Sequence, residues 1–293
     1  MLISVVIRTL NEARHLPALL AGIAKQRLDG HQCEVVLVDS GSTDGTLRVA
    51  EEGGCRIVHI RKEDFSFGRS LNVGCQAAKG DALVFVSGHC IPFDTHWLAR
   101  LVAPLGQQRV AYTYGGQVGD SSTHFSERQI FAKYFPVVSK VPQEGFYCNN
   151  ANSALLRSEW QQLRFDEEIT GLEDMHLAKE LVQRGRCLAY VADAKVYHLH
   201  DESWRQVKRR FEREAIALQR IMPEVHLGPL DVARYALSAI LLDCGAALQD
   251  RSLRQHFMRI VAYRSCQFWG AFKGNRVHRQ LSRVAKERYY YPR

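Results

Sequence analysis

Short apolar runs, each ending abruptly in polar residues, recur through the first ninety residues and constrain the fold more than any other feature. The runs cover residues 3–7, 34–38, 56–60 and 82–87. Between the first two, leucine and isoleucine fall at helical spacing over residues 16–23, and "TLRVAEEGG" forms a second helical pattern that ends at paired glycines. Strands that alternate with helices in this way predict an α/β fold built on a parallel sheet.

Polar side chains directly follow three of these runs. In an open α/β sheet the ligand binds outside the carboxyl ends of the strands, so we expect these side chains to line one crevice. The residues are Arg8, Thr9, Asn11 and Glu12, then Asp39, Ser40 and Ser42, and finally Ser87, Gly88 and His89.

Composition and cysteine usage indicate a globular chain in a reducing compartment. Of the 293 residues, 46% are hydrophobic and 24% charged, and the eight cysteines show no CxxC spacing that would indicate a zinc knuckle or a disulfide framework. Met1 is followed by "LISVVIRT" without a signal-peptide pattern, and the longest apolar stretch is broken by Asp243. We therefore expect a cytoplasmic protein without a transmembrane helix.

Positive charge is concentrated at the C-terminal end. From Ser203 onward the chain carries 18 of its 39 Lys and Arg residues and 7 of its 31 Asp and Glu residues, so residues 1–202 hold 21 against 24. The same region is helical in pattern and rich in aromatics, including residues 289–291. We predict a domain of residues 1–202 and a basic helical appendage of residues 203–293. Basic residues among aromatics suit an anionic membrane or a nucleic acid, and the negative balance of residues 1–202 disfavours the nucleic acid.

Six short motifs occur in one order along residues 8–200. They are "RTLNE" (8–12), "DSGSTDGT" (39–46), "GRSLNVG" (68–74), "NNANSALLRSEW" (149–160), "GLEDMHLAKELVQRG" (171–185) and "VYHLH" (196–200). This set resembles the family 2 glycosyltransferases over about residues 3–200. The resemblance implies an inverting, nucleotide-sugar-dependent enzyme with the GT-A fold, a Rossmann-like mixed, mainly parallel sheet with helices on both faces. Residues 62–74 also resemble rhamnosyltransferase-type relatives.

The resemblance implies roles for particular residues. It makes Asp174 the general base that takes the proton of the acceptor hydroxyl, with Glu173 orienting the acceptor or the base. The residues expected at the nucleotide sugar are Thr9, Asn11, Glu12, Asp39, Ser40, Arg69, Asn72, Ser87, Gly88 and His89, and those expected at the acceptor or sugar are Asn149, Asn150 and Asn152.

Purely structural roles remain open for several of these residues. Glu173 can cap its helix, Glu12 and Arg69 can form a salt bridge, and the asparagines can stabilise turns.

One expected feature of the family is missing. Family members usually end the strand that corresponds to residues 82–87 in an Asp-x-Asp motif that binds a divalent cation, and here the residues are Ser87, Gly88 and His89. Three explanations are open. In the first, His89, with His198 or His200, is a ligand of a divalent metal, Mn²⁺ or Mg²⁺, or a hydrogen-bond donor to the diphosphate. An imidazole suits Mn²⁺ or Zn²⁺ and is a poor ligand for Mg²⁺. In the second, Arg69, His89 or basic residues near Arg205 and Lys208 neutralise the diphosphate without metal. In the third, the chain has lost turnover and only binds.

The sequence thus predicts a glycosyltransferase that moves a hexosyl or deoxyhexosyl group to a hydroxyl of a glycan or lipid-linked acceptor in bacterial-type surface polysaccharide synthesis. The alternative is a non-catalytic nucleotide- or sugar-binding module on the same fold. Because such enzymes often act on lipid-linked acceptors at the inner leaflet, we also expect the basic region to lie on the inner face of the cell membrane. The donor, the acceptor and the oligomeric state are not indicated by the sequence.

Overall fold

The computed structural model describes residues 1–276 and Tyr290, and within it the chain forms two compact units. Residues 289 and 291, which belong to the predicted aromatic end of the chain, lie outside the described residues. The first unit consists of residues 1–120, 134–168 and 173–199, and the second of residues 121–133, 169–172 and the chain from His200 onward.

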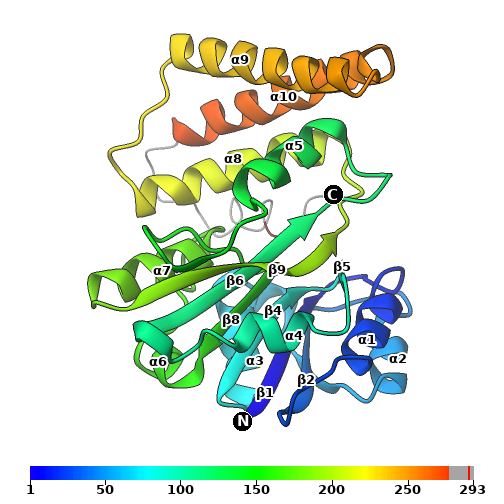
Figure 1. Cartoon of the computed structure of the whole chain (residues 1–293), viewed down its shortest axis with the longest axis vertical. Helices are drawn as coiled ribbons and strands as arrows, with labels where there is room; N and C mark the ends of the chain where they lie inside the picture. The colour runs from blue at the N-terminus through cyan, green and yellow to red at the C-terminus, as the bar shows by residue number, and fades with distance from the viewer. Residues whose placement is uncertain (277–289, 291–293) are drawn as a thin grey trace. The chain divides into compact units, whose positions relative to one another are not determined.

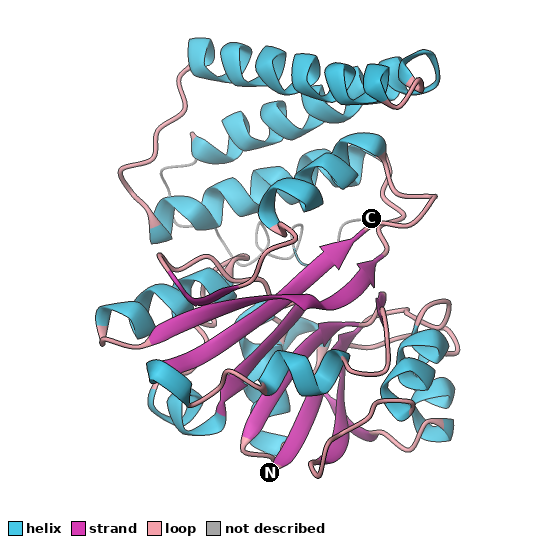
Figure 2. Cartoon of the chain, in the orientation of Figure 1, coloured by secondary structure: helices cyan, strands magenta, loops and turns pink. Residues whose placement is uncertain are grey.

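The first unit is built on a nine-stranded mixed sheet (Figures 1 and 2). The order is β3-β2-β1-β4-β8-β6-β9-β5, and β7 also pairs with β9. The strands β1 to β4 are mutually parallel, as β6 and β9 are, while β8 runs antiparallel to β4 and β6. The strands are β1 (Leu2–Thr9), β2 (Gln32–Asp39), β3 (Arg56–His59), β4 (Ala82–Ser87), β5 (Cys90–Pro92), β6 (Val110–Val118), β7 (Lys140–Gln143), β8 (Asn152–Leu156) and β9 (Cys187–His198).

Alternating side chains of the central strands fill a separate core on each face of the sheet. Val6 and Val38 belong to one core, which also contains residues of α3, α6 and α7, and Ile3 and Ile7 belong to the other, with residues of α1 and α4. The prediction of a mixed α/β fold with helices on both faces is confirmed. These helices are α1 (Leu16–Ala24), α2 (Thr46–Glu52), α3 (Phe67–Ala77), α4 (Trp97–Val102), α6 (Arg157–Gln162) and α7 (Glu173–Gln183).

The predicted helical C-terminal part is also confirmed. Its elements are α8 (Trp204–Ile221), α9 (Pro229–Gln249) and α10 (Leu253–Asn275), and α5 (Phe125–Tyr134) contributes most of its length to the same unit. Two glycines of α10, Gly270 and Gly274, face backbone carbonyl groups of α8, where an added Cβ atom would collide with them. Close approach of the two helices therefore requires glycine at these positions. No helix in the described part of the chain is long and apolar enough to cross a membrane.

One buried ion pair and one partly buried ion-pair group tie the second unit together. Arg264 of α10 donates two hydrogen bonds of 2.7 Å to Asp243 of α9. Arg210 of α8 donates to Glu127 and to Glu202, each at 2.7 Å. Removing one partner of such a pair would leave an uncompensated buried charge, so each pair fixes how these helices pack.

Candidate functional site

The carboxyl ends of β1, β2 and β4 lie side by side, as the sequence predicts. Thr9 is in register with Asp39, and Arg8 with Ser87. The loops that follow β1 and β2 are tied together, because Asn11 Oδ1 accepts a hydrogen bond of 2.8 Å from the backbone N–H of Thr43. This edge of the sheet is thus a connected structure, not a set of independent loops.

Asp39 is buried beneath the loop that follows β2. Its carboxylate accepts hydrogen bonds from the backbone N–H groups of Gly41, at 2.9 Å, and Ser42, at 3.1 Å. Ser40 and Thr9 are buried beside it and bond to backbone carbonyls, the former to Thr9 and the latter to Val38. The carboxylate therefore shapes this loop, whatever ligand the loop holds.

Two carboxylates lie at the start of α7. Glu173 Oε1 accepts a hydrogen bond of 3.0 Å from Arg8 Nη1, and Asp174 accepts two of 2.7 Å from the backbone N–H groups of Asn150 and Met175. Both carboxylates are buried. The hydrogen bond from Arg8 to Glu173 places the acidic pair of α7 beside the end of β1, although 165 residues separate Arg8 from Glu173 in the sequence.

The environment of Asp174 favours a proton acceptor that works near neutral pH. Burial raises the pKa of this carboxyl most, and the charge of Glu173 raises it further. The two backbone N–H groups and the charge of Arg8 act in the opposite direction, and the pKa lies at about 7. A general base is most effective when its pKa is close to the operating pH, so Asp174 has the property that its predicted role needs.

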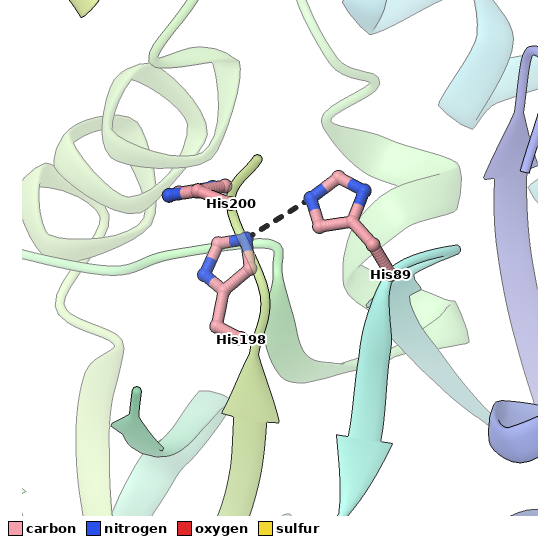
Figure 3. A group of neighbouring side chains, drawn as sticks. All are labelled: His89, His198 and His200. Carbon is pink, nitrogen blue, oxygen red and sulfur yellow. Dashed lines mark hydrogen bonds between the residues drawn. The ribbon is translucent and has the colours of Figure 1, made fainter. Parts of the chain in front are cut away.

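A chain of hydrogen bonds connects Glu12, His89, His198 and Gln117 (Figure 3 draws the two rings together with His200). Glu12 Oε1 lies 2.8 Å from His89 Nδ1, and Gln117 Oε1 lies 2.7 Å from His198 Nδ1. The Nε2 atoms of the two histidines are 3.2 Å apart. Each ring is therefore held at Nδ1 by an oxygen and directs Nε2 at the other ring.

The backbone N–H of Ala151 determines where the protons lie in this series of hydrogen bonds. The N–H of Ala151 donates to Asn149 Oδ1, which also accepts from Gln117 Nε2, so Gln117 presents its oxygen to His198. His198 then carries its proton on Nδ1, and His89 donates from Nδ1 to the Glu12 carboxylate. With both rings neutral, two Nε2 lone pairs would face each other. A proton shared by the two nitrogens, or a cation that both lone pairs approach from one side, would relieve this repulsion.

The donor set of the histidine pair fits a divalent cation. Two imidazoles on one tetrahedral ion, with metal–nitrogen distances of about 2.0–2.1 Å, place their nitrogens about 3.3–3.4 Å apart. The separation here is 3.2 Å. Metal-bound histidines usually donate their other N–H to a carboxylate or carbonyl oxygen, which is the arrangement of both rings. Nitrogen ligands suit Mn²⁺ or Zn²⁺ better than Mg²⁺.

Gly88 leaves room for the Glu12 side chain beside the Ser87-Gly88-His89 segment. An added Cβ atom at Gly88 would lie 2.9 Å from Glu12 Cγ. A side chain at position 88 would therefore displace the residue that holds His89. The carboxylate next to the histidine pair is that of Glu12, which follows β1, whereas the segment after β4 contributes the ring of His89.

His200 lies in the second unit, beyond the end of β9. Its Nδ1 atom is 2.7 Å from Glu127 Oε1, which also binds Arg210. Burial raises the pKa of Glu127, but the hydrogen bond and charge of His200 and the charge of Arg210 outweigh it and hold this pKa at about 2. The role of His200 as a metal ligand stays a prediction.

Arg69 and Asn72 of α3 have different surroundings from each other. Asn72 is buried, and its amide binds the backbone of Phe165, the indole N–H of Trp160 and the carboxylate of Glu167. Asn72 therefore anchors the segment after α6. Arg69 is exposed and lines a shallow surface cavity with Arg164 and Glu167. The sequence also allowed a salt bridge between Arg69 and Glu12. Among the described residues, the Glu12 carboxylate bonds to His89 instead.

The three asparagines of "NNANSALL" lie at successive depths. Asn152 is fully buried and binds Trp97 and two backbone carbonyls, while Asn149 belongs to the hydrogen-bond chain of His198. Asn150 accepts from Tyr112 and Ser153. The amides thus hold the segment that presents its backbone N–H to Asp174.

Two contributions to the site are not assigned from the sequence motifs. Gln117, at the end of β6, fixes the His198 ring, and Arg8 fixes Glu173. Arg8 is recognisable as a polar residue at a strand end. Gln117 is not, because it follows "TYGG" without a motif and reaches His198 only through the pairing of β6 with β9.

Comparison with known proteins gives consistent relatives. The model of glycosyl transferase family 2 matches residues 4–160. The O-antigen chain rhamnosyltransferase RfbN of Salmonella typhimurium is 25% identical over 224 residues, which cover 72% of this chain and 70% of that protein. A PGL/p-HBAD biosynthesis glycosyltransferase of Mycobacterium bovis is 36% identical over 126 residues, which cover 42% of this chain and 48% of that protein.

Solved structures show the same fold. The mannosyltransferase PcManGT from Pyrobaculum calidifontis, in complex with GDP-Man and Mn²⁺, has a TM-score of 0.66 at 18% identity, covering 94% of this chain and 88% of that one. Glucosyl-3-phosphoglycerate synthase from Mycobacterium tuberculosis, in complex with Mg²⁺ and UDP, has a TM-score of 0.54 at 21% identity, covering 74% of this chain and 78% of that one.

Proposed function

Because the chain belongs to glycosyl transferase family 2, we propose that it moves a deoxyhexosyl group, rhamnosyl in the first instance, from a nucleoside-diphosphate sugar to a hydroxyl group of a surface glycan or its lipid-linked precursor. The observation that carries this proposal is the buried Asp174 carboxyl at the start of α7, held by the backbone N–H groups of Asn150 and Met175 beside Glu173, with its pKa raised by burial and by the charge of Glu173. The similarity to an O-antigen rhamnosyltransferase supports the choice of sugar and acceptor class.

The reaction follows from the groups at the carboxyl end of the sheet. The Asp174 carboxylate takes the proton of the acceptor hydroxyl while the oxygen of that hydroxyl forms a bond to the anomeric carbon of the donor. The bond from that carbon to the diphosphate oxygen breaks on the opposite side, and the electron pair leaves with the nucleoside diphosphate. Attack opposite the leaving group inverts the anomeric centre. The backbone N–H groups of Asn150 and Met175 hold Asp174 during this step, and Arg8 holds Glu173 beside it.

We further propose that His89 and His198 hold a divalent cation, Mn²⁺ in preference to Mg²⁺. The spacing of their Nε2 atoms and the oxygen partners of both Nδ1 atoms support this assignment. A cation bound there would neutralise the negative charge of the leaving diphosphate. Glu12 and Gln117 orient the two rings, and Asp39 shapes the loop that we propose to hold the nucleoside.

Calorimetric titration of the full chain with UDP, GDP, dTDP and CDP tests the donor assignment. We expect one of these nucleotides to bind in the presence of Mn²⁺ and to bind at least about tenfold more weakly in EDTA, since the diphosphate charge is then uncompensated. Binding that EDTA leaves unchanged would contradict the metal assignment. Absence of binding to all four nucleotides, with and without Mn²⁺, would contradict the proposed function.

We also propose that α10 brings the enzyme to anionic lipid at the inner face of the cell membrane. Phe257, Met258 and Trp269 are exposed on this helix, together with Arg254 and Lys273. Exposed aromatic and aliphatic side chains beside cations suit a membrane interface.

Vesicle flotation tests this surface. We expect the chain to float with phosphatidylglycerol vesicles in low salt and to bind several-fold more weakly in 0.5 M NaCl or as the Trp269→Ser variant. Gln255→Ser on the same helix is the control and should float like the unmodified chain. A folded chain that stays unbound in low salt would disprove membrane association through α10.

A further inference from the structure

Helix α9 presents a stripe of exposed leucines beside its packed side. Asp243 and Ala247 are buried and mark the packed side. Leu230, Leu237, Leu241 and Leu248, the leucine stripe, are 86%, 58%, 62% and 65% exposed. At 3.6 residues per turn these four side chains fall within an arc of about 40°, about 120° round the helix from the packed side. Nothing in the described part of the chain covers them.

The leucine stripe is symmetric along the helix. Leu237 and Leu241 lie at equal distances on either side of Ala239, and Leu230 and Leu248 do the same farther out. If a second copy of α9 is laid antiparallel on the first with a two-fold axis at Ala239, each leucine meets a leucine. Arg234 then meets the region of Cys244 and Gly245, where small side chains leave room for its long one. A surface that is complementary to itself under a two-fold rotation is what a symmetric dimer requires.

The charges on α9 favour a protein partner over an anionic lipid surface. Along the helix the charged residues are Asp231, Arg234 and Asp243, and Asp243 is neutralised by Arg264. One negative and one positive charge remain on the solvent side, whereas helices that bind anionic lipid carry an excess of Lys and Arg beside the apolar face. In the antiparallel arrangement the N-terminus of each helix also lies beside the C-terminus of the other, so the helix dipoles attract.

We propose that the chain forms a two-fold symmetric homodimer in which the leucine stripes of two α9 helices pack antiparallel. From Leu230 to Leu248 the stripe is about 27 Å long at 1.5 Å per residue, and it is about one helix wide. A contact of this size is smaller than the interfaces of stable complexes and corresponds to a weak, transient association. We therefore expect dissociation constants in the micromolar range.

Sedimentation velocity of the full chain between about 1 and 100 µM tests the dimer. The unmodified chain should shift from monomer to dimer over this range, and Leu241→Glu should weaken dimerisation about 100-fold, since it places carboxylates in an apolar contact. Leu242→Glu is the matched control. Leu242 is 73% exposed and points about 100° away from the stripe, so this variant should dimerise normally. Both positions are exposed, and equal melting temperatures will show that neither change unfolds the chain.

A charge-pair variant tests the antiparallel orientation. In the proposed dimer Leu237 of one copy faces Leu241 of the other, so Leu237→Lys combined with Leu241→Glu should restore about tenfold or more of the affinity that Leu241→Glu loses. In a parallel pair, like charges would meet and nothing would be restored. The proposal is overturned if the unmodified chain stays monomeric at 100 µM. Loss of vesicle binding in Leu241→Glu, with the unmodified chain a monomer, would show that the stripe binds lipid instead.

Discussion

Replacement of Asp174 by asparagine is expected to lower kcat by about 10²–10⁴-fold, the usual contribution of a positioned general base. The amide has nearly the shape of the carboxyl group but takes no proton from the acceptor hydroxyl. Nucleotide binding should persist, because Asp174 contacts the backbone of Asn150 and Met175 and not the loop of Asp39. Initial rates of sugar transfer and calorimetric nucleotide affinity, measured on the same preparation, check both halves of this result.

The pH dependence of kcat/KM provides a second measurement of the same role. Since the base must be ionised, the rate should rise with pH and level off above the pKa of Asp174, which lies at about 7. Glu173→Gln removes a charge that raises this pKa, so the midpoint should move down. Arg8→Met removes a charge that lowers it, so the midpoint should move up. Asp174 is not the base if Asp174→Asn is as active as the unmodified chain. The same conclusion follows if neither Glu173→Gln nor Arg8→Met shifts the midpoint of the pH profile. A protein with no transfer activity to lose would instead fit a non-catalytic binding module.

The strands at the N-terminal end could be predicted because each buried run stops at a polar residue. All four runs became β1 to β4, and the residues after three of them share one edge. Parallel strands impose this arrangement, so the pattern of apolar and polar residues is sufficient to find it.

What the sequence could not give is the choice of partner for each side chain. Asn72 occurs in a motif that suggests ligand contact, but its amide is used by Trp160, Phe165 and Glu167, about ninety residues away. The reason for Gly88 depends on the position of the Glu12 side chain, and the tautomer of His198 depends on Gln117. Such contacts are set by packing between strands that are distant in the chain, and no local pattern encodes them.

The exposed leucines of α9 are a related case. The segment reads as a buried or amphipathic helix, because apolar residues occur all round it. The structure separates them into a packed side around Asp243 and an exposed leucine stripe. Periodicity identifies the helix, but only the packing of α9 with its neighbours shows which apolar side remains uncovered.

Substitution of either histidine of the pair is expected to remove Mn²⁺ binding. His89→Gln and His198→Gln should each weaken Mn²⁺ about 100-fold or more, because each removes one of two converging ligand nitrogens. Glu12→Gln and Gln117→Met leave both rings present but unsupported at Nδ1, and should weaken Mn²⁺ by about 10–100-fold. His96→Gln, at the start of α4, is the control and should bind like the unmodified chain.

The Mn²⁺ and nucleotide affinities of these four variants distinguish a metal site from a proton shared by the two rings. If a cation lies between the rings, loss of Mn²⁺ affinity, measured by electron paramagnetic resonance of free Mn²⁺, should run parallel to loss of nucleotide affinity across all four variants. If a proton lies there instead, the unmodified chain will bind Mn²⁺ no more tightly than His89→Gln does, and its nucleotide affinity will be the same with and without EDTA. The 3.2 Å separation of the Nε2 atoms then reflects one imidazolium paired with Glu12. Under that outcome the positive charge that meets the diphosphate would belong to the protein itself.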